Sequence, residues 1–337
     1  MTIILRATTL PRRAIFFSSA KQHQRFTSPI TASTMPLSSS STTDGSTQPN
    51  KTWDRKDGVF STVGIGPALY QDAGGGLRFR QHVNPLKREL QIPAQPLDWE
   101  AVYQDPTLPL LVDIGCGYGR FLLAHLSSTP GYNGLGMEIR GPIVERANGW
   151  ATTLNLHTRA RFMVANATCS FFPVLSTYPG PISLVTIQYP DPHFKKRHRK
   201  RRTVQPQLVE GIATLVAPGG HVLLQSDVKE VAEHMRDQFE QYSSVSECFE
   251  LDQVHFQPNA VFFSYEGNDS DGNDEGSNAD DTTDTSTSTD TPIAWESVWA
   301  RKGGWLRDNP LPVPTERELH VLGQGLPVYR VLLVRKK

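Results

Sequence analysis

The chain has 337 residues, a formal net charge of zero, 38% hydrophobic and 20% charged residues, and only three cysteines. Cys116, Cys169 and Cys248 are odd in number and far apart, which argues against a disulfide framework or a structural zinc site and in favour of a reducing compartment. No apolar run approaches the roughly 18 residues of a membrane span. We therefore expect a soluble protein that holds no metal and does not enter a membrane.

Two stretches have the composition of disordered segments. The leader, residues 1–50, is rich in Ser and Thr, and the segment 267–291 carries eight Asp or Glu and no Lys or Arg. Neither holds enough apolar surface to offset the entropy lost on ordering. The remaining chain, 51–337, is of a size that suits one α/β domain interrupted by this acidic insert.

The leader also has the composition of a targeting signal. Its five basic residues all precede the first acid, Asp44. This composition is typical of a mitochondrial or chloroplast transit peptide, so we expect an organellar protein. The alternative is an ordinary disordered tail on a protein of the nucleus or cytoplasm. The basic run at 195–202 resembles a nuclear localisation signal, but it falls inside the predicted domain.

From residue 108 onward, the hydrophobic pattern alternates between strands and helices. Apolar runs predict strands at 108–114, 132–139, 160–164, 182–188 and 221–225. Helical spacing predicts helices at 119–126, 141–154, 203–216 and 228–240. This βαβ repetition predicts a doubly wound, Rossmann-like α/β sheet with mostly parallel strands. Such sheets bind ligands at the carboxyl ends of their strands.

The first candidate site is a glycine-rich turn after the first predicted strand. Gly115, Gly117 and Gly119 follow Asp113, and glycines here let the backbone approach a ligand and turn into the next helix. Glu138 ends the next strand, 23 residues after Gly115, where a carboxylate can accept both hydroxyls of a ribose. The turn and the acid together predict an adenosine-containing ligand.

The identity of this ligand depends on the spacing of the glycines. A dinucleotide site has G-x-G-x-x-G, which a nicotinamide-dependent oxidoreductase would need, whereas this chain has G-x-G-x-G preceded by Asp113. An acid there repels a pyrophosphate and attracts an amino group. S-adenosylmethionine, which carries an ammonium and a sulfonium, fits better. Asn166 and Ala167 follow the third predicted strand and can lie beside the adenine.

The second candidate site follows the fourth predicted strand. Asp191 stands between Pro190 and Pro192, which stiffen the turn, and it should point at the ligand cleft. The next residues include seven cations in eight positions, namely Lys195, Lys196, Arg197, Arg199, Lys200, Arg201 and Arg202. Such a cluster beside a cleft indicates a substrate with a phosphate backbone and salt-dependent binding.

Taken in order, these motifs resemble the tRNA (guanine-7-)-methyltransferases, a family with the class I S-adenosylmethionine-dependent fold. The resemblance spans about 78–337 apart from the acidic insert. It rests on Arg80–Leu86, Asp113–Gly119, Gly136–Arg140, Asn166-Ala167, Tyr189–Arg202, Gln225–Asp227 and Thr315–Glu318. The Pro-Asp-Pro element followed by Lys-x-Arg-His-x-Lys-Arg-Arg is its most specific part. The resemblance implies an antiparallel strand at the C-terminal end of the sheet.

The resemblance also implies roles for individual residues. It assigns the cofactor to Asp113, Gly115, Gly117, Glu138, Ile139, Asn166, Ala167, Thr315, Glu316, Arg317 and Glu318. It assigns the tRNA or its guanine to Lys195 and Asp227 and makes Asp191 the catalytic aspartate. Arg197, His198, Lys200 and Arg201 are predicted substrate-binding residues because they belong to the phosphate-binding basic run. The chain departs from the family in having His193-Phe194 where Trp is frequent, and in having Asp113 where many bacterial members have Glu.

The implied reaction is methylation of guanine N7 in tRNA, in the variable loop. Because N7 has a lone pair and no proton, the attack needs no base, and positioning of the two ligands supplies much of the acceleration. Asp191 then accepts hydrogen bonds from the guanine and favours the positive charge that develops on the purine. The remaining alternative is a non-catalytic RNA-binding subunit.

Two questions about partners and about the insert stay open at this point. Nuclear and cytosolic members of the family work with a β-propeller partner, whereas bacterial members act alone or as dimers, and the leader favours the second arrangement. The acidic insert at 267–291 is either a passive loop expansion, which we favour, or a segment that competes with tRNA for the basic run.

Overall fold

The computed structural model describes residues 83–242, 245, 247–252 and 297–337. The predicted leader at 1–50 and the acidic insert at 267–291 lie outside the described residues. The predictions of a transit peptide, of a disordered insert and of a single domain from residue 51 therefore stay predictions.

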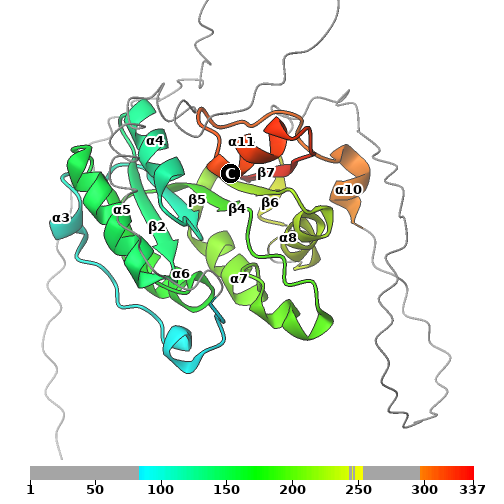
Figure 1. Ribbon diagram of the computed structural model, residues 1–337, viewed down its shortest axis with the longest axis horizontal. Coiled ribbons are helices and arrows are strands. Elements are labelled where there is room, and N and C mark those ends of the chain that lie inside the picture. Colours follow the sequence, from blue (N-terminus) through cyan, green and yellow to red (C-terminus); the bar gives the residue numbers. More distant parts are fainter. Residues whose placement is uncertain (1–82, 243–244, 246, 253–296) are drawn as a thin grey trace, which may run out of the picture. The chain divides into compact units, whose positions relative to one another are not determined.

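The described residues build a seven-stranded sheet in the order β3-β2-β1-β4-β5-β7-β6 (Figure 1). Its strands are β1 Leu110–Ile114, β2 Asn133–Glu138, β3 Ala160–Val164, β4 Ile182–Gln188, β5 Val216–Ser226, β6 Phe249–Leu251 and β7 Tyr329–Arg335. Strands β1 to β5 pair in parallel, and β7 lies antiparallel between β5 and β6. This topology confirms the predicted doubly wound sheet, including its antiparallel C-terminal strand.

Helices cover both faces of this sheet. The longer ones are α4 Arg120–Ser128, α5 Gly141–Thr153, α6 Ala167–Leu175, α7 Pro206–Leu215 and α8 Lys229–Gln241. The shorter ones are η2 Arg88–Gln91, α3 Trp99–Val102, η3 Lys196–Arg201, α10 Val298–Gly303 and α11 Glu316–Gly323. Side chains of α4 and α5 belong to one hydrophobic cluster and those of α6, α7 and α8 to another, so the two groups pack on opposite faces.

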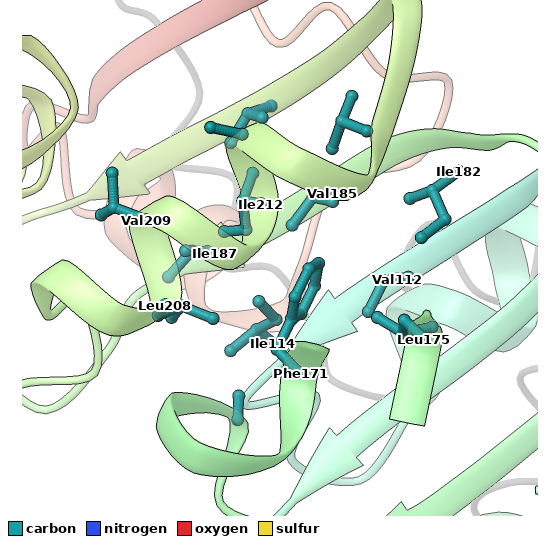
Figure 2. Packing of buried hydrophobic residues seen from close by; sticks show 14 of the residues in the cluster. Val112, Ile114, Phe171, Leu175, Ile182, Val185, Ile187, Leu208, Val209 and Ile212 are labelled. Carbon is teal, nitrogen blue, oxygen red and sulfur yellow. The ribbon is translucent and has the colours of Figure 1, made fainter. Parts of the chain in front are cut away.

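The alternation of side chains along β1 explains why two cores exist. Leu111 packs in the cluster of α4 and α5, while Val112 and Ile114 point to the opposite face. Figure 2 shows this second core, where α6 and α7 lie over the centre of the sheet. Its labelled members are Val112, Ile114, Phe171, Leu175, Ile182, Val185, Ile187, Leu208, Val209 and Ile212. Burial on both faces is why the central strands have nearly unbroken apolar sequences.

The junction between α7 and β5 differs from the prediction. The helix ends at Leu215 and the strand begins at Val216, rather than at residue 221. Val216 pairs with Ile182, and the next pair joins His221 to Leu184, so residues 217–220 bulge out of the ladder. Pro218, Gly219 and Gly220, which suggest a loop before the predicted strand at 221–225, therefore mark a bulge within β5 instead.

Helix α6 was missing from the prediction. Its sequence, ATCSFFPVL, is apolar on most sides and contains Pro173, which usually argues against a helix. Asn166 nevertheless caps the helix, because its side chain accepts a hydrogen bond from the Thr168 N–H. Packing of Phe171 and Leu175 in the core overrides the weak local signal.

Candidate functional site

One cleft gathers many of the predicted site residues at the carboxyl ends of the parallel strands. It has a volume of about 180 Å³, and the ends of β1, β2 and β4 and the residues just after β3 line it. The predicted residues in its lining are Gly115, Glu138, Ile139, Asn166, Ala167, Asp191, Lys200 and Arg201. Residues assigned to the cofactor and to the substrate therefore meet on one surface, as a doubly wound sheet leads us to expect.

The glycine loop borders this cleft with backbone rather than side chains. Gly115, Gly117 and Gly119 have φ values of 72°, 52° and 73°, which other residues adopt only with strain. A Cβ at Gly119 would lie 2.3 Å from the ring of Phe162, whereas a Cβ at Gly115 would meet nothing within 4 Å. Gly119 is thus required by packing, and the space beside Gly115 is open to a ligand.

Glu138 is the buried acid of the cleft, with 4% of its surface exposed. Its carboxylate accepts hydrogen bonds from the Gly117 N–H at 3.2 Å, from the Arg140 N–H at 3.1 Å, and from Arg140 Nε and Nη2 at 3.0 and 2.9 Å. The residue lies where the sequence predicted a ribose acceptor. A ribose that reaches it must replace hydrogen bonds from Arg140.

Asp113 lies under the glycine loop and outside the lining of the cleft. It is buried, and its carboxylate accepts a hydrogen bond of 2.7 Å from the Thr186 hydroxyl. Burial raises the pKa of Asp113 to about 6, because the charged form loses its hydration. Asp113 is therefore a buried acid next to the glycine loop rather than part of the lining of the cleft.

Asn166 lines the cleft but has partners within the chain. Its amide donates hydrogen bonds to the carbonyls of Pro85 at 3.3 Å and Leu90 at 3.1 Å, while its oxygen caps α6. Val83, Pro85, Leu86 and Gln91 also line the cleft. Asn166 therefore anchors an N-terminal segment as one wall of the cleft, a role that the sequence did not reveal.

The turn that carries Asp191 is held in an unusual backbone conformation. Tyr189 and His193 have φ values of 50° and 45°, in the left-handed region that residues with a Cβ rarely adopt. Asp191 itself is exposed and lines the cleft. Such strain is typical of functional turns and persists only when the surrounding structure holds it.

Aromatic side chains flank this turn on its solvent side. His193 lines the cleft, and burial is the main cause that lowers the pKa of its imidazole. Phe194 points to solvent, with 62% of its surface exposed. An exposed aromatic ring next to cations is a surface on which a nucleobase can stack.

The basic run forms the 3₁₀-helix η3 beside the cleft. Lys200 and Arg201 line the cleft, and the side chains of Lys195, Arg197 and Arg199 are exposed. His198 is half-buried, and its pKa is lowered by burial and by the neighbouring cations. The run therefore extends the cleft as a positive surface.

The predicted site residues near the C-terminal end of the chain lie outside the lining of the cleft. Neither Asp227 nor any residue of Thr315–Glu318 lines the cleft. Thr315 caps α11, and the three charged residues after it pair with partners on other elements. The carboxylate of Glu316 accepts hydrogen bonds from Arg120 Nη1 at 2.6 and 2.7 Å. Arg317 forms an ion pair with Asp227. Buried Glu318 accepts a hydrogen bond of 2.6 Å from Nη2 of buried Arg330. These contacts tie α11 to α4, β5 and β7. The cofactor role of Thr315–Glu318 stays a prediction.

Several cleft residues had no individual site role assigned from the sequence. Arg140, Gln188, His193 and Arg202 line it together with the 83–91 segment. Arg140 and Gln188 stand beside predicted strand ends, so their positions could have indicated a role. Nothing local distinguishes Arg202 from the six other cations of the run.

A search of the described ranges for metal-binding groups finds no cluster of three or more His, Cys, Asp or Glu residues. Within the same ranges, no helix combines the length and apolarity that crossing a membrane demands.

Comparisons of the sequence with known proteins find methyltransferases. The chain matches a family model described as "Putative methyltransferase" over residues 107–266. It is 41% identical over 263 residues to the tRNA (guanine-N(7)-)-methyltransferase of Synechococcus sp. strain JA-3-3Ab, which covers 78% of this chain and 88% of that one. It is 40% identical over 260 residues to the protein of the same name from Trichormus variabilis, which covers 77% of this chain and 96% of that one.

Similarity to solved structures is weaker. TrmN from Thermus thermophilus shares 18% identity over 43% of this chain and 38% of that one, with a TM-score of 0.32. Similarity at this level carries no argument about function.

Proposed function

Because the chain belongs to the tRNA (guanine-N(7)-)-methyltransferase family and is an enzyme of that class, we propose that it transfers the methyl group of S-adenosylmethionine to N7 of a guanosine in the variable loop of tRNA. The observation that carries the proposal is the shared cleft, which joins Glu138 and Gly115 to Asp191 and to the cations Lys200 and Arg201. Family membership sets aside both the nicotinamide oxidoreductase and the non-catalytic RNA-binding subunit.

The cofactor side of the cleft fits S-adenosylmethionine. Glu138 offers a buried carboxylate at a strand end, and the space beside Gly115 is open. Ile139 and Ala167 line the same part of the cleft, where an apolar surface suits an adenine ring. When bound, S-adenosylmethionine supplies a methyl group on a sulfonium. Glu138 would hold its ribose, and buried Asp113 would favour its positive charge.

Asp191 is the residue that we assign to the guanine. An exposed carboxylate at the mouth of the cleft can accept hydrogen bonds from the ring N–H and the amino group of the base. As N7 gains a methyl group, the purine becomes positively charged, and a carboxylate at this position stabilises that charge. No base is needed, because N7 carries no proton.

The exposed cations are assigned to the phosphates of the tRNA. Arg197, Arg199 and Lys200 lie on one short helix directly after the Asp191 turn. Phosphates bound there would bring the adjacent nucleotide to Asp191. Phe194 offers a stacking surface for that nucleotide or its neighbour.

The decisive experiment is a methylation assay with S-adenosylmethionine labelled in its methyl group. The protein is incubated with unmodified tRNA transcripts, which are then digested to nucleosides. We expect the label in 7-methylguanosine, and mapping of the modified position should place it in the variable loop. Label in another nucleoside, or no label despite tight tRNA binding, would refute the proposal.

A second proposal concerns the location of the protein. The acid-poor composition of the leader supports import into a chloroplast or mitochondrion. A fusion of residues 1–60 to a fluorescent protein should enter one of these organelles. A nuclear or cytoplasmic signal would favour the alternative location, in which a β-propeller partner becomes the expected arrangement.

A further inference from the structure

Arg202 ends the basic run but differs from the other cations in its surroundings. Its side chain is 5% exposed, whereas Arg197, Arg199 and Lys200 are exposed. Arg202 is the C-cap of η3, and its backbone N–H donates to the carbonyl of Arg199 at 3.1 Å. The guanidinium of Arg202 therefore lies buried in the wall of the cleft, whereas those three cations are exposed.

The buried guanidinium joins two elements that are far apart in sequence. Its Nε donates a hydrogen bond of 3.1 Å to the carbonyl of Pro192, and its Nη2 donates one of 2.7 Å to Glu230 Oε1. Pro192 directly follows Asp191, and Glu230 lies in the first turn of α8. One side chain thus ties the turn of Asp191 to a helix that is packed on the sheet.

The turn is tied to β5 at its start, where the Tyr189 N–H donates a hydrogen bond of 2.8 Å to the Gln225 carbonyl. Pro190 and Pro192 have no N–H groups to donate, and Tyr189 and His193 occupy the left-handed region. A strained turn persists only where its surroundings hold it. Arg202 supplies such a support at the residue next to Asp191, and its planar guanidinium can hold two acceptors in fixed directions.

Glu230 belongs to the same arrangement. The hydrogen bond from Arg202 is the main cause that lowers the pKa of the Glu230 carboxyl below its ordinary value. Glu230 is 52% exposed, which means that it can be changed with little disturbance of the core. Two in-plane donors of the guanidinium, Nε and Nη2, are thus engaged by partners within the chain.

We propose that Arg202 is a positioning residue that fixes Asp191 through the Pro192 carbonyl, and that it is not one of the tRNA-binding cations. This inference rests on the proposed function, because it takes Asp191 as the residue that meets the guanine. The basic run then has two parts with different tasks: exposed cations that bind phosphate, and a buried cation that shapes the active turn.

The test compares two variants that remove the same charge from the same run. Arg202→Gln should lower kcat at saturating tRNA about 10- to 100-fold, because a misplaced reactive group costs rates of this order. Its tRNA affinity and salt dependence should stay close to those of the wild type. The matched variant Arg199→Gln should instead weaken tRNA binding and reduce the slope of log K against log salt by about one phosphate contact.

Two further variants keep the test informative if Arg202→Gln unfolds. Arg202→Lys keeps the charge but not the two-pronged geometry, so it should recover only part of kcat. Glu230→Gln alters the exposed partner and should lower kcat about two- to fivefold, since Arg202 then loses a charged anchor while keeping Pro192. Melting temperatures of all variants show which of them remain folded.

The possible results either support or overturn the role proposed for Arg202. A drop in kcat with unchanged salt dependence for Arg202→Gln, or for Glu230→Gln if the first does not fold, supports the inference. A wild-type kcat, or a loss of tRNA affinity like that of Arg199→Gln, overturns it while leaving the proposed function intact. A wild-type enzyme that makes no 7-methylguanosine overturns the proposed function and this inference with it.

Discussion

The two sides of the cleft differ in how far their charged groups are buried. On the side of the glycine loop, Asp113 and Glu138 are buried and each is held by hydrogen bonds from the chain itself. On the side of η3, Asp191 is exposed and Phe194 points to solvent. A small cofactor can be enclosed by a preformed pocket, whereas a tRNA must reach its catalytic group from outside. Under the proposed function, the buried side would hold the cofactor and the exposed, charged side would meet the nucleic acid.

The two sides also differ in how the backbone is kept in shape. The glycine loop uses three glycines with positive φ, for which this conformation carries little strain. The Asp191 turn places residues with side chains in the same region, so other contacts must hold it. We therefore expect mutations on the first side to act on cofactor affinity and those on the second side to act on turnover or tRNA affinity.

The largest effect is expected at Asp191. Replacing it with Ala should lower kcat about 10²- to 10³-fold, the usual cost of removing a group that stabilises charge in the transition state. The KM for S-adenosylmethionine should change little, since the cofactor is held on the other side. Steady-state kinetics with Asp191→Asn as an isosteric companion measure both constants. A higher cofactor KM at unchanged kcat would break the comparison between the two sides.

Glu138 should show the reverse pattern. Glu138→Ala removes a charged acceptor for two ribose hydroxyls, so the KM for S-adenosylmethionine should rise about 10- to 100-fold. Turnover at saturating cofactor should fall much less. Calorimetric titration of the cofactor without tRNA provides an independent reading, and a wild-type affinity there would contradict the assignment. Glu138→Gln keeps one acceptor oxygen, so its KM for S-adenosylmethionine should lie between those of Glu138→Ala and the wild type.

The exposed cations should govern the response to salt. Changing Arg197, Arg199 and Lys200 together to Ala should weaken tRNA binding about tenfold or more at physiological salt and reduce the salt slope by about two to three. Filter binding or fluorescence anisotropy at several salt concentrations gives the slope. An unchanged slope would mean that the phosphates bind elsewhere.

The smallest expected effect concerns stability on the cofactor side. Burial raises the pKa of Asp113 to about 6 from an ordinary 3.8, so the folded protein binds a proton at a higher pH than the unfolded chain. Stability contributed by this group is therefore present at low pH and is lost as pH rises from about 4 to 6. Asp113→Asn removes the cost of burying this charge, about 2 kcal/mol over this range, so the melting temperature of the variant should gain roughly 4–8 °C relative to the wild type between pH 4.5 and pH 7. A difference in melting temperature between the variant and the wild type that does not change with pH would contradict the raised pKa of Asp113.

The main parts of the fold and of the site follow from local sequence patterns. Apolar runs predicted the central strands. The sequence also predicted that the glycine turn, Glu138 and Asp191 lie at strand ends, because ligands bind at the carboxyl ends of the strands in such a sheet. Helix α6 was not predicted, since Pro173 and an even apolar composition obscure its period. The start of β5 was misplaced because a bulge and a loop have the same Pro-Gly-Gly signal.

The partners of the charged residues did not follow from those patterns. Glu318 pairs with Arg330, and Arg317 with Asp227, 90 residues away. The amide of Asn166 binds carbonyls 81 and 76 residues earlier in the chain. Pairings at this distance depend on how the sheet brings separate segments together, and a single sequence has no periodic signal for them.

The sequence by itself determined the order of strands and helices, the backbone freedom of the glycine loop and the presence of a carboxylate and a cluster of cations after β4. These are local properties, set by hydrophobic spacing, backbone sterics and charge. Only the tertiary structure decided which charged groups are buried, with Arg202 turned inward to Pro192 and Glu230 while Arg199 faces solvent. The physical reason is that burial of a charge requires partners in fixed positions, and here those partners come from elements that meet only when the chain has folded.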